Sequence, residues 1–188
     1  MTHVALFHSV YGRRPAVLAA AERLRAAGHL VVAPDLYAGQ VATSMEEGFA
    51  LSDRIGWEVI MRRAHDAVRD LPGDTVLAGF SMGVGVVAGL LPHRRCTAGL
   101  LLLHGLGGDP ASVRSGLPVH LHIAGQDDLF PPGAVRAWRS AMADAGAAVR
   151  VHTYPGAGHL FTDPDTPDYD EPATKLVWRR TSAFLESL

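Results

Sequence analysis

The chain has 188 residues, a length typical of one domain that buries its own hydrophobic core. Its 17 basic and 19 acidic side chains give a net charge of −2 with no basic block, which argues against nucleic acid and membrane surfaces as partners. The single cysteine, Cys96, excludes an intramolecular disulfide framework. Together with an N-terminus that lacks a signal-peptide pattern, it favours a cytoplasmic location.

Short apolar runs alternate along the chain with longer segments of helical pattern, which is typical of a parallel α/β sheet. Pro15 in a first turn and Gly28 as a stop signal bound the first predicted helix. Ser44 and Glu47 form a capping-box pattern that opens the second helical region. In chain order we predict a strand at residues 4–8, a helix at 15–27, a strand at 30–33, a helical region from 44 to about 69 with a break near Gly56, a strand at 75–78, a helix at 82–91, strands at 98–103 and 119–124, a helix at 132–145, a strand at 149–154 and a helix at 172–188.

These elements predict one domain over residues 1–188, built on a six-stranded, mainly parallel sheet with helices on both faces. In a sheet of this kind, ligands bind beyond the carboxyl ends of the strands. Residues that carry the chemistry are therefore expected directly after strands.

The most informative segment is Gly79-Phe80-Ser81-Met82-Gly83, which follows a predicted strand and precedes a predicted helix. It matches the G-x-S-x-G pattern of a nucleophile elbow, where a sharp turn exposes the serine hydroxyl at the edge of a sheet. Glycines two residues before and after the serine let strand and helix approach closely. An ordinary strand–helix turn is the alternative reading of the same residues.

A serine nucleophile needs a base and a carboxylate that orients the base, and both follow later strands of the predicted sheet. Asp127 and Asp128 come directly after the strand at 119–124, and either is a candidate acid. His159 follows the strand at 149–154 behind Gly156-Ala157-Gly158. The order serine, acid, histidine is the one found on hydrolase folds with an elbow.

Other histidines fit a catalytic role less well. His120 and His122 alternate within one predicted strand, which favours a core or helix-facing position. A metal site would need a third ligand, which the surrounding sequence does not supply at zinc spacing. His8 and His104 lie at strand ends, a position from which we expect side chains to reach the pocket. The acidic segment at residues 163–171 is expected to be a solvated loop rather than a calcium site.

With these residues assembled, the chain resembles the dienelactone hydrolase family of α/β-hydrolases along nearly its whole length. The matching segments are Ala33-Pro34-Asp35-Leu36-Tyr37, Gly79-Phe80-Ser81-Met82-Gly83, Gly125-Gln126-Asp127 with Pro131, Tyr154-Pro155-Gly156-Ala157-Gly158-His159-Leu160-Phe161 and the C-terminal helix from Tyr169-Asp170 to Phe184-Leu185. The resemblance implies the α/β-hydrolase fold and assigns the acid to Asp127. It also implies that the backbone N–H groups of Val10 and Met82 form the oxyanion hole.

The chain departs from the best-known members of that family at three positions. Ser81 stands where those members have cysteine, and Ser9 stands where they have a glutamate after the first strand. Asp163 occupies the position of an arginine that grips the substrate carboxylate in those members. The resemblance therefore implies a serine variant of the family and leaves open whether a dienelactone is its substrate.

We accordingly expect a hydrolase that cleaves a small ester or lactone through Ser81, His159 and Asp127, with no metal or organic cofactor. Candidate substrate-binding residues are Ser9, Tyr11, Arg13 and Phe161. Arg13 and Arg14 also fit a solvated surface role. The alternatives are a thioesterase or other acyl-transfer enzyme with the same triad, and a non-catalytic relative that binds a small ligand. The composition is compatible with a homodimer.

Overall fold

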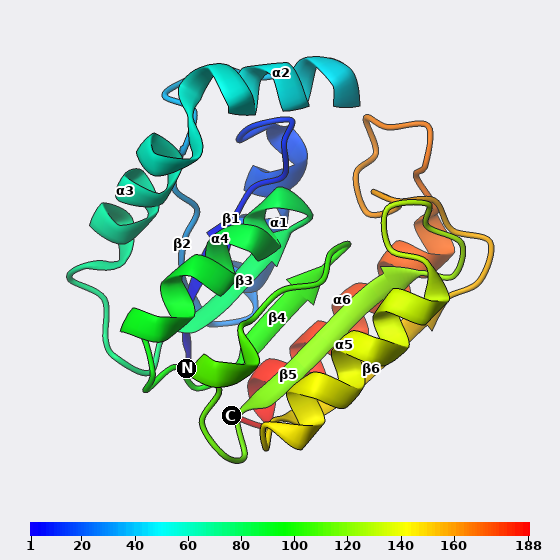
Figure 1. Cartoon of the computed structure of the whole chain (residues 1–188). Coiled ribbons are helices and arrows are strands. Elements are labelled where there is room, and N and C mark those ends of the chain that lie inside the picture. The colour runs from blue at the N-terminus through cyan, green and yellow to red at the C-terminus, as the bar shows by residue number, and fades with distance from the viewer.

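The computed structural model describes residues 1–188 and contains one six-stranded parallel sheet with the strand order β2-β1-β3-β4-β5-β6 (Figure 1). The strands are β1 (His3–Phe7), β2 (Leu30–Val32), β3 (Val76–Phe80), β4 (Leu100–Leu103), β5 (Pro118–Ala124) and β6 (Ala148–Tyr154). The sheet order places β3 and β4 at the centre, and β2 and β6 form the two edges. The fold class predicted from the sequence is thus confirmed.

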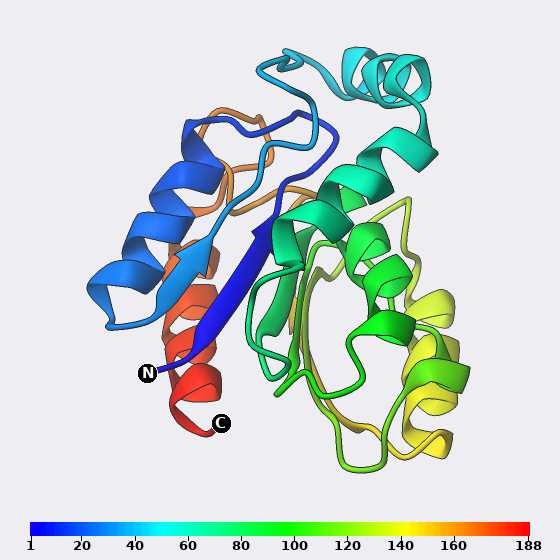
Figure 2. The ribbon, with the colours of Figure 1, turned by 90° about the vertical axis from the view of Figure 1, so that its left-hand side faces the viewer.

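Helices cover both faces of the sheet, with α1 and α6 on one face and α3, α4 and α5 on the other (Figure 2). The remaining helix, α2, lies beyond the edge at which the strands end (Figure 1). The helices are α1 (Pro15–Ala26), α2 (Met45–Ile55), α3 (Trp57–Val68), α4 (Met82–Leu90), α5 (Pro132–Asp144) and α6 (Glu171–Glu186), with short 3₁₀ turns at Leu91–His93 and Pro110–Ser112. None of these helices has the length and hydrophobicity that crossing a bilayer requires.

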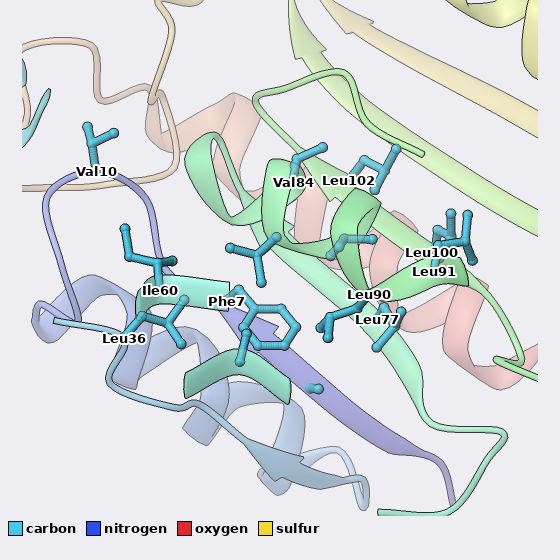
Figure 3. Close-up of a cluster of buried hydrophobic side chains, with 14 of the residues drawn as sticks. Phe7, Val10, Leu36, Ile60, Leu77, Val84, Leu90, Leu91, Leu100 and Leu102 are labelled. Atoms are coloured by element: carbon cyan, nitrogen blue, oxygen red, sulfur yellow. The ribbon is translucent and has the colours of Figure 1, made fainter. Parts of the chain in front are cut away.

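The side chains of the central strands divide between two hydrophobic cores because successive residues of a strand point to opposite faces. Leu100 and Leu102 belong to the core beneath α3, α4 and α5, part of which is drawn in Figure 3. Leu101 and Leu103 belong to the core beneath α1 and α6. All four are buried, which explains why this strand is a continuous leucine run rather than an alternating pattern.

The helical region after residue 44 breaks where the sequence predicts it. The Ser44 hydroxyl accepts a hydrogen bond from the Glu47 N–H at 3.1 Å and caps α2. Gly56 then adopts a φ of +85°, a conformation that side-chain-bearing residues rarely adopt, and separates α2 from α3. This break lets α2 run across the carboxyl edge of the sheet while α3 packs against α4.

Candidate active site

The turn between β3 and α4 holds Ser81 at φ +48° and ψ −106°, an unusual backbone conformation for a non-glycine residue. A Cβ atom on Gly79 would lie 2.3 Å from the backbone of Gly83. A Cβ atom on Gly83 would lie 2.4 Å from the carbonyl oxygen of Phe7. The two glycines are therefore required for α4 to begin directly against β1 and β3, and Ser81 remains partly exposed at the tip of this turn.

The base predicted from the sequence lies within hydrogen-bonding distance of this serine. Ser81 Oγ is 2.8 Å from His159 Nε2, although 78 positions separate the two residues in the chain. The loop that brings His159 to the elbow passes close to Asp168, whose carboxylate accepts a hydrogen bond from the Leu160 N–H at 3.2 Å. A Cβ atom on Gly158 would collide with this carboxylate at 2.3 Å, so the glycine before the histidine allows the loop to be tied down.

Asp127 contacts the other nitrogen of the same ring, with Oδ2 at 2.7 Å from His159 Nδ1. Its second oxygen accepts a hydrogen bond from the Leu129 N–H at 3.0 Å. Burial raises the pKa of Asp127, but hydrogen bonding to His159 and to the amides of Leu129 and Phe130 outweighs it and leaves the pKa below its ordinary value. An ionised Asp127 accepts the Nδ1–H, which leaves Nε2 free to accept the serine proton. Asp128, the other candidate acid, is exposed.

Two backbone amides, those of Val10 and Met82, are expected at the oxyanion hole. The N–H groups of Val10 and Met82 donate to no acceptor within the protein, and the Met82 amide is the first of α4. Gly48 of α2 packs directly on Val10, since a Cβ atom there would lie 2.9 Å from the Val10 carbonyl oxygen. Tyr37 contacts the other residue of the pair, since its hydroxyl lies 3.1 Å from Met82 Sδ.

His104 was expected to line the pocket, but it is fully buried and packs against the ring of His159. Its ring centroid lies 6.4 Å from that of His159 and 4.6 Å from that of Phe161, and its Nε2 lies 2.6 Å from Thr162 Oγ1. Burial lowers the pKa of His104 to about 3. On the other side, the ring of Phe130 lies 5.9 Å from His159. This packing could not be predicted from the sequence, because no pattern joins these residues.

His8 is likewise buried and does not face the pocket. Its Nδ1 donates to the carbonyl oxygen of Ser9 at 2.7 Å, and its Nε2 accepts from the Leu36 N–H at 3.1 Å. Burial lowers the pKa of His8 to about 4. The neutral ring thereby ties the loop after β1, which carries the Val10 amide, to the segment after β2.

The four candidate substrate-binding residues have other contacts in the structure. Ser9 Oγ accepts from the Tyr11 N–H at 3.3 Å, and both residues are buried. Arg13 lies 3.8 Å from the Asp35 carboxylate and donates to the Ala33 carbonyl oxygen at 3.3 Å. Phe161 has no exposed surface. These contacts give all four residues a structural role, in packing or in holding the loops around the site.

Arg14 and Asp163 are not the solvated side chains that the sequence suggested. The Arg14 guanidinium forms an ion pair with Asp163, and the two side chains are only 10% and 13% exposed. The guanidinium also lies 4.0 Å above the ring of Tyr11. The position where the resembling family has a substrate-gripping arginine is therefore part of an internal ion pair here, formed because residues 149 positions apart meet at the sheet edge.

The sequence-based view that His120 and His122 lack a third histidine was incomplete. The register between β5 and β6 places His152 directly opposite His122, and one ring nitrogen from each of the three histidines lies within 4.8 Å of the others. Burial lowers the pKa of His120 and of His152 to about 4. The third residue was missed because parallel pairing, unlike local spacing, is not visible in the chain.

Two hollows in the protein surface lie away from Ser81. One of about 640 Å³ lies between α1 and α6, beside Arg23, Lys175 and Trp178. Another, of about 460 Å³, lies near Met1 and Leu188 at the opposite edge of the sheet. Neither contains a pair of groups arranged like Ser81 and His159, so the chemistry assigns the site to the carboxyl edge of the strands.

Comparisons with known proteins agree with this fold and give its family. A family model described as the dienelactone hydrolase family matches residues 2–188. A dienelactone hydrolase-like promiscuous phosphotriesterase from metagenomic libraries has a similar structure, with a TM-score of 0.81, 22% identity, and coverage of 99% of this chain and 86% of the other. A provisionally named dienelactone hydrolase from Klebsiella pneumoniae gives a TM-score of 0.81 at 19% identity, covering 100% and 88%. No curated protein sequence matches the chain.

Proposed function

Because the chain belongs to the dienelactone hydrolase family and is thus a hydrolase of the carboxylic-ester type, we propose that it cleaves small esters or lactones with Ser81 as the nucleophile. The observation that carries this proposal is the continuous chain of hydrogen bonds from Ser81 Oγ through His159 to Asp127, at 2.8 and 2.7 Å. Such a chain activates a hydroxyl that is otherwise a poor nucleophile at neutral pH.

In the acylation step, Ser81 Oγ bonds to the substrate carbonyl carbon while His159 Nε2 takes the hydroxyl proton. The carbonyl oxygen becomes an oxyanion, and the amides of Val10 and Met82 donate hydrogen bonds to it. Each such donor contributes about 10²–10³-fold in rate. The intermediate then collapses, and His159 returns its proton to the alcohol oxygen that leaves.

Water then hydrolyses the acyl-enzyme through the same kind of steps, with water in place of the serine hydroxyl as the nucleophile. His159 takes a proton from the attacking water, whose oxygen bonds to the acyl carbon, and Ser81 Oγ leaves and regains the proton. Asp127 keeps the same imidazole tautomer throughout and stabilises the ring when it is charged. In a lactone the leaving alcohol remains tethered, so hydrolysis gives a single hydroxy acid.

Small substrates are supported by the surroundings of the elbow. Ser81 is partly exposed, and α2, with its eleven residues, is the only helix beyond the ends of the strands (Figure 1). The position that would hold a substrate carboxylate by resemblance is Asp163, which is paired with Arg14. A short, uncharged acyl group or lactone ring therefore fits these surroundings better than an anionic dienelactone.

A series of p-nitrophenyl esters with lengthening acyl chains, together with simple lactones, tests the proposal. We expect the highest kcat/KM for short acyl chains, and Ser81→Ala should remove nearly all turnover. Ser140→Ala, which alters an exposed serine on α5, is the matched control and should keep full activity. Unchanged esterase activity in Ser81→Ala would end the proposal, and a preference for long acyl chains would contradict its substrate class.

A further inference from the structure

Three histidines on the sheet face beneath α6 form a cluster outside the catalytic site. His120 and His122 come from β5, and His152 comes from the adjacent edge strand β6. The ring of His152 lies 5.2 Å from that of His120 and 4.7 Å from that of His122. His122 is fully buried and the other two are partly buried. Nothing in the proposed mechanism uses these rings.

Each ring has a nitrogen without a partner. His120 Nδ1, His122 Nε2 and His152 Nε2 are shielded from solvent, yet none of them has a hydrogen-bond partner. An unpaired buried polar atom costs about 1–3 kcal/mol, so three in one cluster need an explanation. Three neutral imidazoles that present lone pairs to one another are a ligand set for a borderline-soft divalent cation.

The distances fit such an ion after a small movement. Three ligand atoms at most 4.8 Å apart lie within about 2.8 Å of a common centre. Zinc–nitrogen bonds are about 2.0–2.1 Å long, so each ring must move by less than about 1 Å, which rotation of a side chain supplies.

The environment of His122 supports the same role. Its Nδ1 lies 2.7 Å from the Tyr154 hydroxyl, which holds the ring, and its Nε2 is the buried nitrogen that has no partner. Metal-bound histidines are commonly held through their second nitrogen in this way. The guanidinium of Arg180 lies 5.4 Å from the ring of Tyr154, and Arg150 is opposite His120 in the register. These positive charges disfavour binding of a divalent cation without an anionic ligand, and they favour an anion or hydroxide as the fourth ligand of the ion.

We propose that His120, His122 and His152 bind one Zn²⁺ ion, with water or an anion in the fourth position. The ion would cross-link the strands that lead to the acid and the base, because β5 runs into the loop of Asp127 and β6 into the loop of His159. It would act there as a structural brace, since the cluster contributes no group to the elbow. This proposal does not depend on the hydrolytic function of Ser81.

The test uses the full chain after treatment with a chelator and removal of the chelator. Titration with Zn²⁺ by calorimetry should give one site per chain and a rise in Tm, because an ion that binds only the folded state stabilises it. Co²⁺ should give the visible absorption of a four-coordinate nitrogen site. Added Zn²⁺ should then displace the Co²⁺ and abolish this absorption. No one-site binding by the wild-type protein would overturn the proposal without bearing on its esterase activity.

Variants assign the ion to the cluster. His152→Gln should weaken Zn²⁺ binding by more than about 100-fold, since loss of a ligand costs more than loss of a partner that only orients one. His65→Gln is the matched control, because His65 and His93 form an isolated histidine pair with ring centroids 5.0 Å apart. Ser81→Ala should bind zinc like the wild type. Equal affinity of His152→Gln and the wild type for Zn²⁺ would overturn the assignment. If His152→Gln does not fold, the Co²⁺ spectrum of the wild type tests the assignment instead.

Discussion

Arg14 and Asp163 form a nearly buried ion pair that joins the loop after β1 to the loop after His159. The first loop carries the Val10 amide, and the second continues from His159, the proposed base. The pair therefore connects two parts of the site that come from opposite ends of the chain. Its removal tests whether this connection matters for stability and for the geometry of the site.

We predict that Asp163→Asn destabilises the protein by about 3 kcal/mol, because it leaves a buried guanidinium without its counter-charge. Urea unfolding measures this loss. In a double-mutant cycle with Arg14→Met, the double variant should recover part of it, since both charges are then absent. Asp66→Asn breaks the exposed pair between Asp66 and Arg69 and should change stability by less than about 1 kcal/mol. Equal effects of the two single asparagine variants would contradict the structural role of Arg14 and Asp163.

Gly48→Ala should reduce catalysis more than it reduces stability. The new methyl group would lie 2.9 Å from the Val10 carbonyl oxygen and would displace the loop that presents the Val10 amide. We expect kcat/KM for a p-nitrophenyl ester to fall by about 10-fold or more, a partial loss of the effect of one oxyanion donor. Gly133→Ala in α5 is the control, because its nearest atom would be 3.9 Å away on the flexible side chain of Arg136. Full activity in folded Gly48→Ala would remove Val10 from the proposed oxyanion hole.

Asp127→Asn should lower kcat by about 10⁴-fold while the protein remains folded. An asparagine amide can donate to His159 Nδ1, which favours the tautomer protonated at Nε2, and that nitrogen then cannot accept the serine proton. Asp128→Asn changes the adjacent, exposed carboxylate and should leave kcat unchanged. Steady-state rates of both variants with one ester, alongside their circular dichroism spectra, decide the matter. The reverse ranking of the two variants would make Asp128 the acid.

The elbow could be predicted from the sequence because its determinants are local. Gly79, Ser81 and Gly83 specify a turn by their own backbone requirements, and the parallel sheet follows from the alternation of short apolar runs with helical segments. The same reasoning brought Asp127 and His159 to the strand ends, where the structure places His159 in hydrogen-bond contact with both Asp127 and Ser81.

Pairings between distant segments could not be predicted in the same way. The ion pair of Arg14 with Asp163 depends on two loops meeting, and the approach of His152 to His122 depends on the register of β5 and β6. The burial of His104 was also not visible, because a residue after a strand can point either into the pocket or beneath it. Its positive φ of 62° turns the chain so that the ring packs below His159.

Acid should destabilise the fold through His8 and His104, which are neutral in the folded protein. Their folded-state pKa values are about 4 and about 3, below the value of about 6.5 in an unfolded chain. The unfolded chain therefore binds more protons between these values, and stability is lost as the pH falls below 6.5. Each histidine contributes up to about 1.4 kcal/mol per pH unit in this window.

The free energy of unfolding in urea, measured from pH 8 to pH 4.5, tests this linkage. Above about pH 7 the two histidines contribute no slope, because they are neutral in both states. Between pH 6 and pH 5, His8→Gln should reduce the slope of the unfolding free energy against pH by the equivalent of about one bound proton. A stability that is constant from pH 7 to pH 5 would show that these rings are not held neutral by the fold.

Covalent labelling with a fluorophosphonate probe tests the central claim most directly, because the probe reacts with an activated serine rather than with a hydroxyl at random. Peptide mapping of the labelled wild-type protein should find one adduct per chain, on Ser81. The Ser81→Ala variant should take up no label, and the Ser140→Ala variant should be labelled like the wild type. A wild-type protein that stays unlabelled, or a Ser81→Ala variant that is labelled as fast as the wild type, would contradict the account.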